Sequence, residues 1–151
     1  MPLHYTLQNV TEQEYDRLVQ VWESAVKATH HFLKEEDLEF YKNLMPQFLN
    51  AVALKSLKDE TGLILGFIGT ADGNLEMLFV HADTRGKGIG KTLLLYALQE
   101  LKITKVDVNQ DNAQAVGFYE RFGFQTYKVS ETDGFGKPYP ILHMNLIKNT
   151  I

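Results

Sequence analysis

The chemistry of this chain centres on a glycine-rich, basic turn between an apolar segment and an amphipathic one. The turn consists of Arg85, Gly86, Lys87, Gly88, Ile89, Gly90 and Lys91. Residues 75–80 before it are apolar except for Glu76, and the apolar residues of 93–101 recur at helical spacing. Glycines let backbone N–H groups approach an anion closely, and a helix N-terminus carries about half a positive charge. This strand–turn–helix unit therefore predicts a phosphate-binding site.

Two common phosphate-binding motifs fail on spacing. Gly90-Lys91-Thr92 matches the end of a Walker A loop, but the opening glycine of that loop would fall on Arg85. The dinucleotide fingerprint G-x-G-x-x-G also fails, because the glycines here stand at 86, 88 and 90, and no second βαβ half follows. The spacing that fits is R-x-x-G-x-G, formed by Arg85, Gly88 and Gly90. We therefore do not expect a nucleotide-binding module.

Composition narrows the function further. With 151 residues, 44% hydrophobic and 23% charged, the chain is expected to form one domain over residues 1–151. A net charge of −4 argues against nucleic-acid binding. The absence of cysteine excludes disulfides, thiolate metal sites and a cysteine nucleophile, and the five histidines form no H-E-x-x-H pattern, so no metal is expected. No signal peptide and no apolar run of about 20 residues is present, so we expect a cytoplasmic protein without membrane contact.

The first half of the chain predicts a strand, two helices and an antiparallel meander. The strand covers residues 4–8, and a capping box of Thr11 and Glu14 opens a helix that extends to about Lys27. A second helix is predicted from Lys34 to Met45, where Pro46 ends or kinks it. Turn signals separate three predicted strands at 51–57, 63–71 and 75–80.

The second half predicts a parallel crossover followed by a hairpin. The helix after the glycine turn leads to a strand at 105–109, which implies parallel pairing with the strand before the turn. A further helix is predicted from Asn112 or Ala113 to Phe122, with Gly123 at its C-terminal end. Strands at 124–130 and 141–146 complete the chain.

This element order and two motifs resemble the GNAT superfamily of N-acetyltransferases. The R-x-x-G-x-G turn resembles its pyrophosphate-binding motif, and residues 112–124 resemble its N-x-x-A-x-x-x-Y-x-x-x-G-F signature. The resemblance covers nearly the whole chain. It implies an α+β GNAT fold: a mixed, mostly antiparallel sheet with a βαβ phosphate-binding unit and helices on both faces. Shorter motifs at 28–33, 108–112 and 136–140 resemble a YjaB-like subgroup of small bacterial acetyltransferases.

The resemblance implies a site for acetyl-CoA, the acetyl donor. Backbone N–H groups of residues 85–91 would bind the pyrophosphate, and the side chains of Arg85, Lys87 and Lys91 would add charge-assisted bonds. In this family the strand before the turn diverges from the next one, and the pantetheine arm pairs with its exposed edge. By resemblance, the main chains of Phe79 and Val80 bind the arm, and Val80 polarises the thioester. Further cofactor contacts are expected from Asn112, which also suits a helix N-cap, and from Ala115 and Phe118.

The same resemblance assigns the catalytic groups. Tyr119 matches the general acid, and protonation of a thiolate by a phenol is uphill by about 2 kcal/mol from their ordinary pKa values. Glu76 is the first candidate for the base, because strand alternation would place it opposite Leu75 and Met77, facing a cleft. His30 is the second candidate, since it lies between the first two helices and titrates near neutrality.

The sequence therefore predicts an N-acetyltransferase that transfers an acetyl group directly from acetyl-CoA to a primary amine in a ternary complex. The acceptor is a small-molecule amine or a protein lysine, and Asp133 and Tyr139 are expected to line its pocket. The alternative is a catalytically silent acyl-CoA-binding sensor or scaffold. Neither nucleic acid nor membrane is expected as a partner, and the sequence leaves monomer and homodimer both open.

Overall fold

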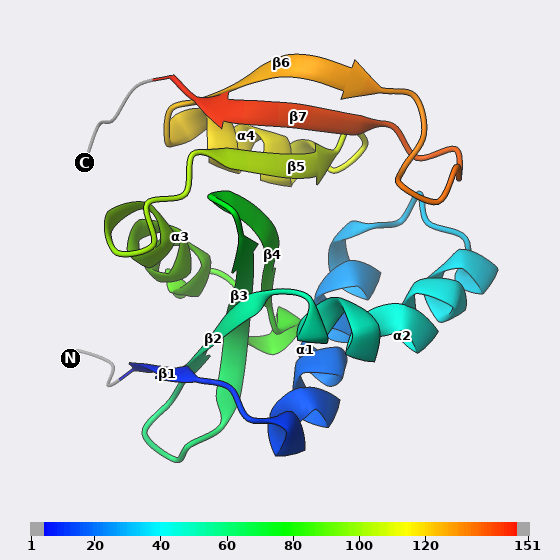
Figure 1. Cartoon of the computed structure of the whole chain (residues 1–151). Helices are drawn as coiled ribbons and strands as arrows, with labels where there is room; N and C mark the ends of the chain where they lie inside the picture. The colour runs from blue at the N-terminus through cyan, green and yellow to red at the C-terminus, as the bar shows by residue number, and fades with distance from the viewer. Residues whose placement is uncertain (1–4, 148–151) are drawn as a thin grey trace.

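The computed structural model describes residues 5–147 and contains one seven-stranded mixed sheet (Figure 1). The strands lie in the order β1-β2-β3-β4-β5-β7-β6. Their bounds are β1 Thr6–Asn9, β2 Ala53–Lys58, β3 Ile64–Ala71, β4 Asn74–Val80, β5 Lys105–Asn109, β6 Phe124–Ser130 and β7 Ile141–Leu146. Neighbouring strands pair antiparallel except β4 and β5, which are parallel, so the predicted mixed, mostly antiparallel sheet is confirmed.

Helices cover both faces of the sheet, as the sequence predicted (Figure 1). They are α1 Tyr15–Thr29, α2 Glu35–Asn50, α3 Ile89–Gln99 and α4 Ala113–Arg121, with short 3-10 turns η1 Glu12–Glu14 and η2 Ala82–Thr84. One buried apolar cluster joins α1 and α2 to the face of β3 that carries Phe67. A second cluster joins α3 and α4 to the opposite face, where Ile68 and Met144 are fully buried. The sheet is therefore packed on both faces, which keeps its strands in fixed positions.

Most predicted elements are present, several with the predicted bounds. The strands at 105–109, 124–130 and 141–146 match residue for residue, and Gly123 has the left-handed φ of +95° that a helix C-terminal glycine adopts. The capping box of Thr11 and Glu14 is confirmed, although the turn that it opens is the 3-10 turn η1. The first strand begins at Thr6, and its predicted first residue, His4, lies outside the described residues.

The second helix was predicted to end at Met45, with Pro46 ending or kinking it. The predicted end was wrong, because α2 continues through Pro46 to Asn50. Proline in a helix interior costs about 3 kcal/mol relative to alanine. On either side of it, Met45 and Leu49 are 2% and 1% exposed against the apolar cluster. Full burial of two such side chains contributes roughly 1.5–3 kcal/mol each, which outweighs the proline penalty.

The β4 strand differs from the prediction in a way that matters for the site. Its register on β3 shifts between the pairs Gly69–Met77 and Thr70–Leu75, so Glu76 is the additional residue of a β-bulge. Simple alternation placed Leu75 and Met77 on one face, and that was wrong. Leu75 packs in the α3 cluster, whereas Met77 packs in the α1–α2 cluster.

The β4 and β5 strands separate soon after they begin to pair. Within residues 5–147 their ladder comprises the pairs Asn74–Lys105 and Leu75–Val106. Beyond the bulge, β4 pairs with β3 from Met77 to Val80, and within residues 5–147 its other edge has no strand partner there. This confirms the predicted divergence, and it leaves an edge with unpaired backbone groups beside the glycine turn.

Candidate active site

One cavity of about 220 Å³ lies between β4, the glycine turn and α4. We call it the donor groove. Seven of the residues predicted to bind the cofactor line it, namely Phe79, Val80, Arg85, Gly90, Asn112, Ala115 and Phe118. The unpaired edge of β4 therefore faces the start of α4 across a space in which an extended ligand could bind.

The glycine turn adopts the conformation that an anion site requires. Gly86 and Gly88 have φ values of +81° and +78°, which other residues rarely adopt, and a Cβ on either would meet open space. The first hydrogen bond of α3 runs from Thr92 N to Gly88 O, so the amides of residues 89–91 precede it. The side chain of Ile89 is buried in the core, so only the backbone of this residue is available to contact a ligand in the groove. These amides and the open turn fit a pyrophosphate.

The charged groups around the groove differ partly from those predicted. Arg85 lines it and donates from Nη2 to the Gln114 side chain on α4. Lys87 and Lys91 are exposed on the turn but do not line the groove. Arg121 does line it, and sequence reasoning missed this residue. Its position three residues after Phe118, on the same helix face, was the available signal.

Asn112 caps α4 as predicted. Its Oδ1 accepts a hydrogen bond of 3.3 Å from Ala115 N, and the residue also lines the donor groove. The cap uses the side-chain oxygen, so the amide NH₂ group can still donate to a ligand. The structural role is therefore observed, and the cofactor contact stays a prediction compatible with it.

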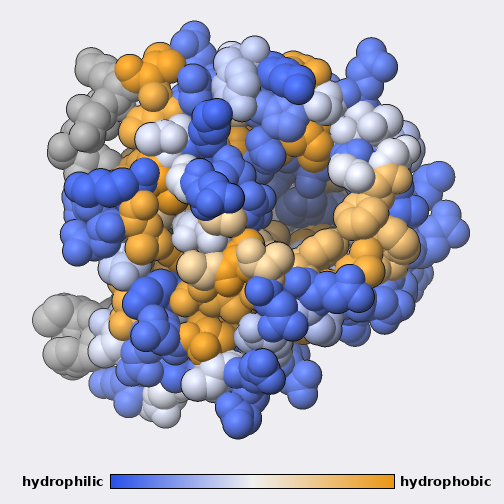
Figure 2. Space-filling view, in the orientation of Figure 1, coloured by the Kyte–Doolittle hydropathy of each residue, from blue (hydrophilic) through white to orange (hydrophobic). Residues whose placement is uncertain are grey.

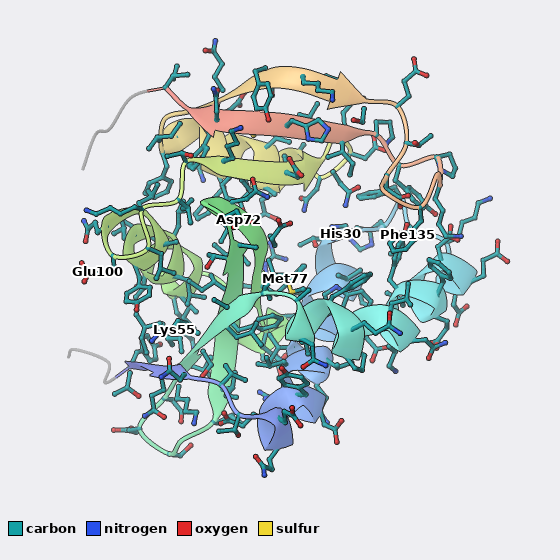
Figure 3. All side chains as sticks on the ribbon, viewed as in Figure 1. His30, Lys55, Asp72, Met77, Glu100 and Phe135 are labelled. Atoms are coloured by element: carbon teal, nitrogen blue, oxygen red, sulfur yellow. The ribbon has the colours of Figure 1, made fainter. Side chains whose placement is uncertain are left out.

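A second, larger cavity of about 540 Å³ lies on the α1–α2 side of β4. We call it the acceptor cavity. Figure 2 shows it as a hollow beside apolar side chains, and in Figure 3 His30, Met77 and Phe135 lie around this region from different parts of the chain. Its lining includes Glu76 of the β4 bulge, together with Asp133 and Tyr139 of the β6–β7 loop. That Asp133 and Tyr139 contact the acceptor stays a prediction.

The β6–β7 loop, residues 131–140, is bonded firmly to α2. Tyr41 of α2 donates a hydrogen bond to Asp133, and Tyr139 donates one to Asp37. Lys137 Nζ lies 2.9 Å from Asp37 Oδ1, and the hydrogen bonds from Tyr139 and Lys137 lower the pKa of Asp37. These contacts join residues about 100 positions apart in the sequence, which is why local patterns did not reveal them. They fix the outer wall of the acceptor cavity.

The two cavities meet at His30 and Phe79, which line both. Thr29 Oγ1 lies 2.8 Å from Ala25 O, to which it can only donate, and 2.7 Å from His30 Nδ1. A hydroxyl has one hydrogen, so Thr29 accepts from His30, and Nδ1 carries the imidazole proton. Burial lowers the pKa of His30 to about 4, and the neighbouring His31 adds to the effect. At neutral pH His30 is therefore uncharged, with an unprotonated Nε2.

Tyr119 lies deeper than a residue in contact with substrate would. Its side chain is 7% exposed, its ring packs against Phe118 and Phe124, and it lines neither cavity. Burial raises its pKa, which keeps the phenol protonated but also makes it a weaker acid. The general-acid role of Tyr119 thus stays a prediction.

Over residues 5–147, no three or more histidine, aspartate or glutamate side chains are grouped so that they could hold a metal ion. None of the helices there is both long enough and apolar enough to span a membrane.

The fold and the paired cavities define an acetyltransferase of the GNAT type, and comparison with known proteins agrees. The sequence matches the acetyltransferase (GNAT) domain family over residues 23–145, and the chain belongs to this family. It is 36% identical over 132 residues to the peptidyl-lysine N-acetyltransferase YjaB of Escherichia coli K12, covering 87% of this chain and 90% of that protein.

Solved structures support the same assignment. The solution structure of apo YjaB from Escherichia coli superposes with a TM-score of 0.89 at 33% identity, covering 96% of this chain and 99% of that one. The PaiA N-acetyltransferase of Thermoplasma acidophilum, solved in complex with coenzyme A, has a TM-score of 0.68 at 20% identity, covering 95% and 99% of the two chains. The second likeness concerns the fold alone.

Proposed function

We propose that this protein transfers the acetyl group of acetyl-CoA directly to a primary amine bound in the acceptor cavity. The observation that carries the proposal is the meeting of the two cavities at His30 and Phe79, beside the unpaired edge of β4. Donor and acceptor can then bind from opposite sides and react where the cavities join. Positioning two reactants in this way removes much of the entropic barrier of a bimolecular step.

The donor is held by backbone groups more than by side chains. The amides of residues 89–91 and the N-terminus of α3 bind the pyrophosphate, assisted by Arg85 and Arg121. The edge of β4 pairs with the pantetheine arm, and the main chain of Val80 polarises the thioester carbonyl. When bound, acetyl-CoA supplies an activated acetyl group.

Proton transfer completes the reaction. The bound ammonium first gives up one proton to solvent, and the neutral amine nitrogen then forms a bond to the acetyl carbon. The carbon–sulfur bond breaks, and the nitrogen, positively charged after the attack, loses its second proton. We assign ammonium binding to Glu76 and acceptance of the proton to Nε2 of neutral His30, because His30 lies where the cavities join. Tyr119, which lines neither cavity, supplies the proton of the leaving thiolate through water, and His30 and Tyr119 then recover their starting protonation through solvent.

The acceptor is proposed at two levels. A primary amine follows from the reaction class and from the carboxylate of Glu76 in the acceptor cavity. A lysine in a polypeptide is the first specific acceptor to test, because relatives at 36% identity are named peptidyl-lysine N-acetyltransferases. Free primary amines could also bind in this cavity.

The test is thiol release from acetyl-CoA across a panel of free amines and lysine peptides, with calorimetry of CoA binding on the same protein. The enzyme is expected to release thiol with at least one acceptor class. Glu76→Gln should raise KM for the amine, whereas His30→Gln and Tyr119→Phe should lower kcat while CoA still binds. Tight CoA binding without release across the whole panel would instead identify a silent acyl-CoA-binding module.

A further inference from the structure

The acceptor cavity has one end suited to an ammonium group. Glu76 lines it from the β4 bulge and is exposed to solvent. Among residues 5–147 its carboxylate takes part in none of the side-chain hydrogen bonds or ion pairs. A carboxylate left in this state on the cavity lining is available to a cationic ligand.

The other acids near the cavity are already bonded. Asp133 Oδ1 accepts from the amides of Phe135 and Lys137 at 2.9 and 3.0 Å, and its other oxygen accepts from Tyr41. Asp37 accepts from Tyr139 and pairs with Lys137. These carboxylates hold the β6–β7 loop on α2, so their structural contacts occupy most of their bonding capacity. The cavity therefore has one carboxylate that is open to a ligand, and that one lies at the β4 end.

Much of the lining that the helices and the loop contribute is aromatic. This aromatic wall comprises Trp22 of α1, Tyr41 and Phe48 of α2, and Phe135 and Tyr139 of the loop. Phe135 packs edge-on or tilted against Phe40, Tyr41 and Phe48, with ring centroids 5.3–6.0 Å apart. This packing and the bonds of the loop form the wall before any acceptor binds, so little has to be ordered on binding.

The size of the cavity favours a bulky guest. Its volume of about 540 Å³ lies within the range of roughly 300–1,000 Å³ typical of small-molecule sites. A lysine side chain is one unbranched aliphatic chain and would leave much of the aromatic wall in contact with water. Binding energy from apolar burial grows with the area covered, so a broad apolar body gains more from this wall than a slender chain does.

We propose that the preferred acceptor is an arylalkylamine, a primary amine on an aromatic body, with its ammonium at Glu76 and its ring against the wall formed by Tyr41, Phe48 and Phe135. This inference rests on the proposed acetyltransfer and names its substrate class. Polyamines have no aromatic body and bury less apolar area against this wall, so they are poorer acceptors than monoamines that carry one.

The first test compares acceptors on the unaltered protein. Phenethylamine, n-butylamine, spermidine and a lysine peptide are compared by kcat/KM for thiol release. Phenethylamine should exceed each of the others by at least about tenfold, the usual effect of added apolar contact in a pocket. A lysine peptide or spermidine that matches or exceeds phenethylamine would overturn this proposal while leaving the acetyltransfer intact. Absence of release with every amine, with CoA bound, would overturn both, and calorimetry identifies that case.

A second test narrows the cavity. Gly134 lines it, has no left-handed φ, and a Cβ there would meet nothing within 4 Å. Gly134→Leu should therefore place a side chain in open space without backbone strain. The substitution should lower kcat/KM for phenethylamine by about tenfold or more and leave n-butylamine within about threefold. Glu131→Leu, on the same loop but outside the cavity lining, is the matched control and should change neither value. Equal losses for both amines in Gly134→Leu would contradict the placement of the aromatic ring.

Discussion

The burial of His30 as a neutral group predicts how the free energy of unfolding depends on pH, and this prediction does not depend on catalysis. Burial lowers its pKa from 6.5 to about 4, which corresponds to about 3 kcal/mol in favour of the uncharged folded form. Between these pH values the unfolded chain binds a proton at this position and the folded chain does not. The contribution of His30 to folding stability is therefore fully present above about pH 6.5 and is lost as the pH falls towards 4. At pH 5 the loss that His30 causes is about 2 kcal/mol.

The measurement is the free energy of unfolding in urea at pH 7.5 and pH 5, for the unaltered protein and for His30→Gln. Glutamine does not titrate, so the variant should lose about 2 kcal/mol less between the two pH values. His31→Gln is the control: burial is the larger cause of the low pKa and His31 the smaller, so most of the wild-type pH dependence should remain. If the wild type and His30→Gln lose stability in parallel, His30 is not buried as a neutral group, and the argument for its role as a proton acceptor fails with it.

Three further predictions concern other parts of the fold. A Cβ at Gly90 would meet Phe118 and two neighbours at ordinary contact distances of 3.8–3.9 Å, so Gly90→Ala should fold normally. It should weaken CoA binding by about tenfold, and unchanged affinity in calorimetry would show that CoA does not contact this position. Asn112→Ala should lower the unfolding free energy by about 1 kcal/mol through loss of the cap of α4, and Asn112→Ser should restore most of it; equal stability of all three proteins would contradict the capping role. Pro46→Ala should raise the unfolding free energy by about 1–3 kcal/mol, because it restores an amide donor inside α2, and a destabilised variant would show that the ring itself is needed.

The sequence predicted the elements that local signals define. The strands at 105–109, 124–130 and 141–146 were predicted residue for residue, because each is a short segment of alternating or apolar character bounded by turn residues. The donor groove was also predictable in large part, since the glycine spacing and the motif that begins at Asn112 identify both of its walls. The groove forms where two segments meet, and each segment carries a motif that can be recognised without the other.

The remaining features depend on contacts that no local pattern encodes. The β4 bulge at Glu76 arises from the register against β3, and single-strand alternation cannot show it. The aromatic wall of the acceptor cavity requires Phe135 to meet α2, which depends on the bonds that Tyr41 and Lys137 make across the molecule. Pro46 lies within α2 because the buried residues around it outweigh a local preference.

The brief ladder between β4 and β5 has a mechanical consequence. The sheet is hydrogen-bonded across this line by the pairs Asn74–Lys105 and Leu75–Val106 in the described chain, whereas β3 and β4 pair along nearly their whole length. We expect this seam to act as a hinge between two half-sheets, β1 to β4 and β5 to β6. A pantetheine arm on the open edge of β4 would take the place of the missing strand partner and act as a wedge that holds the halves at a fixed angle. We therefore expect donor binding to slow amide hydrogen exchange on both sides of the seam, including strands that the ligand does not touch.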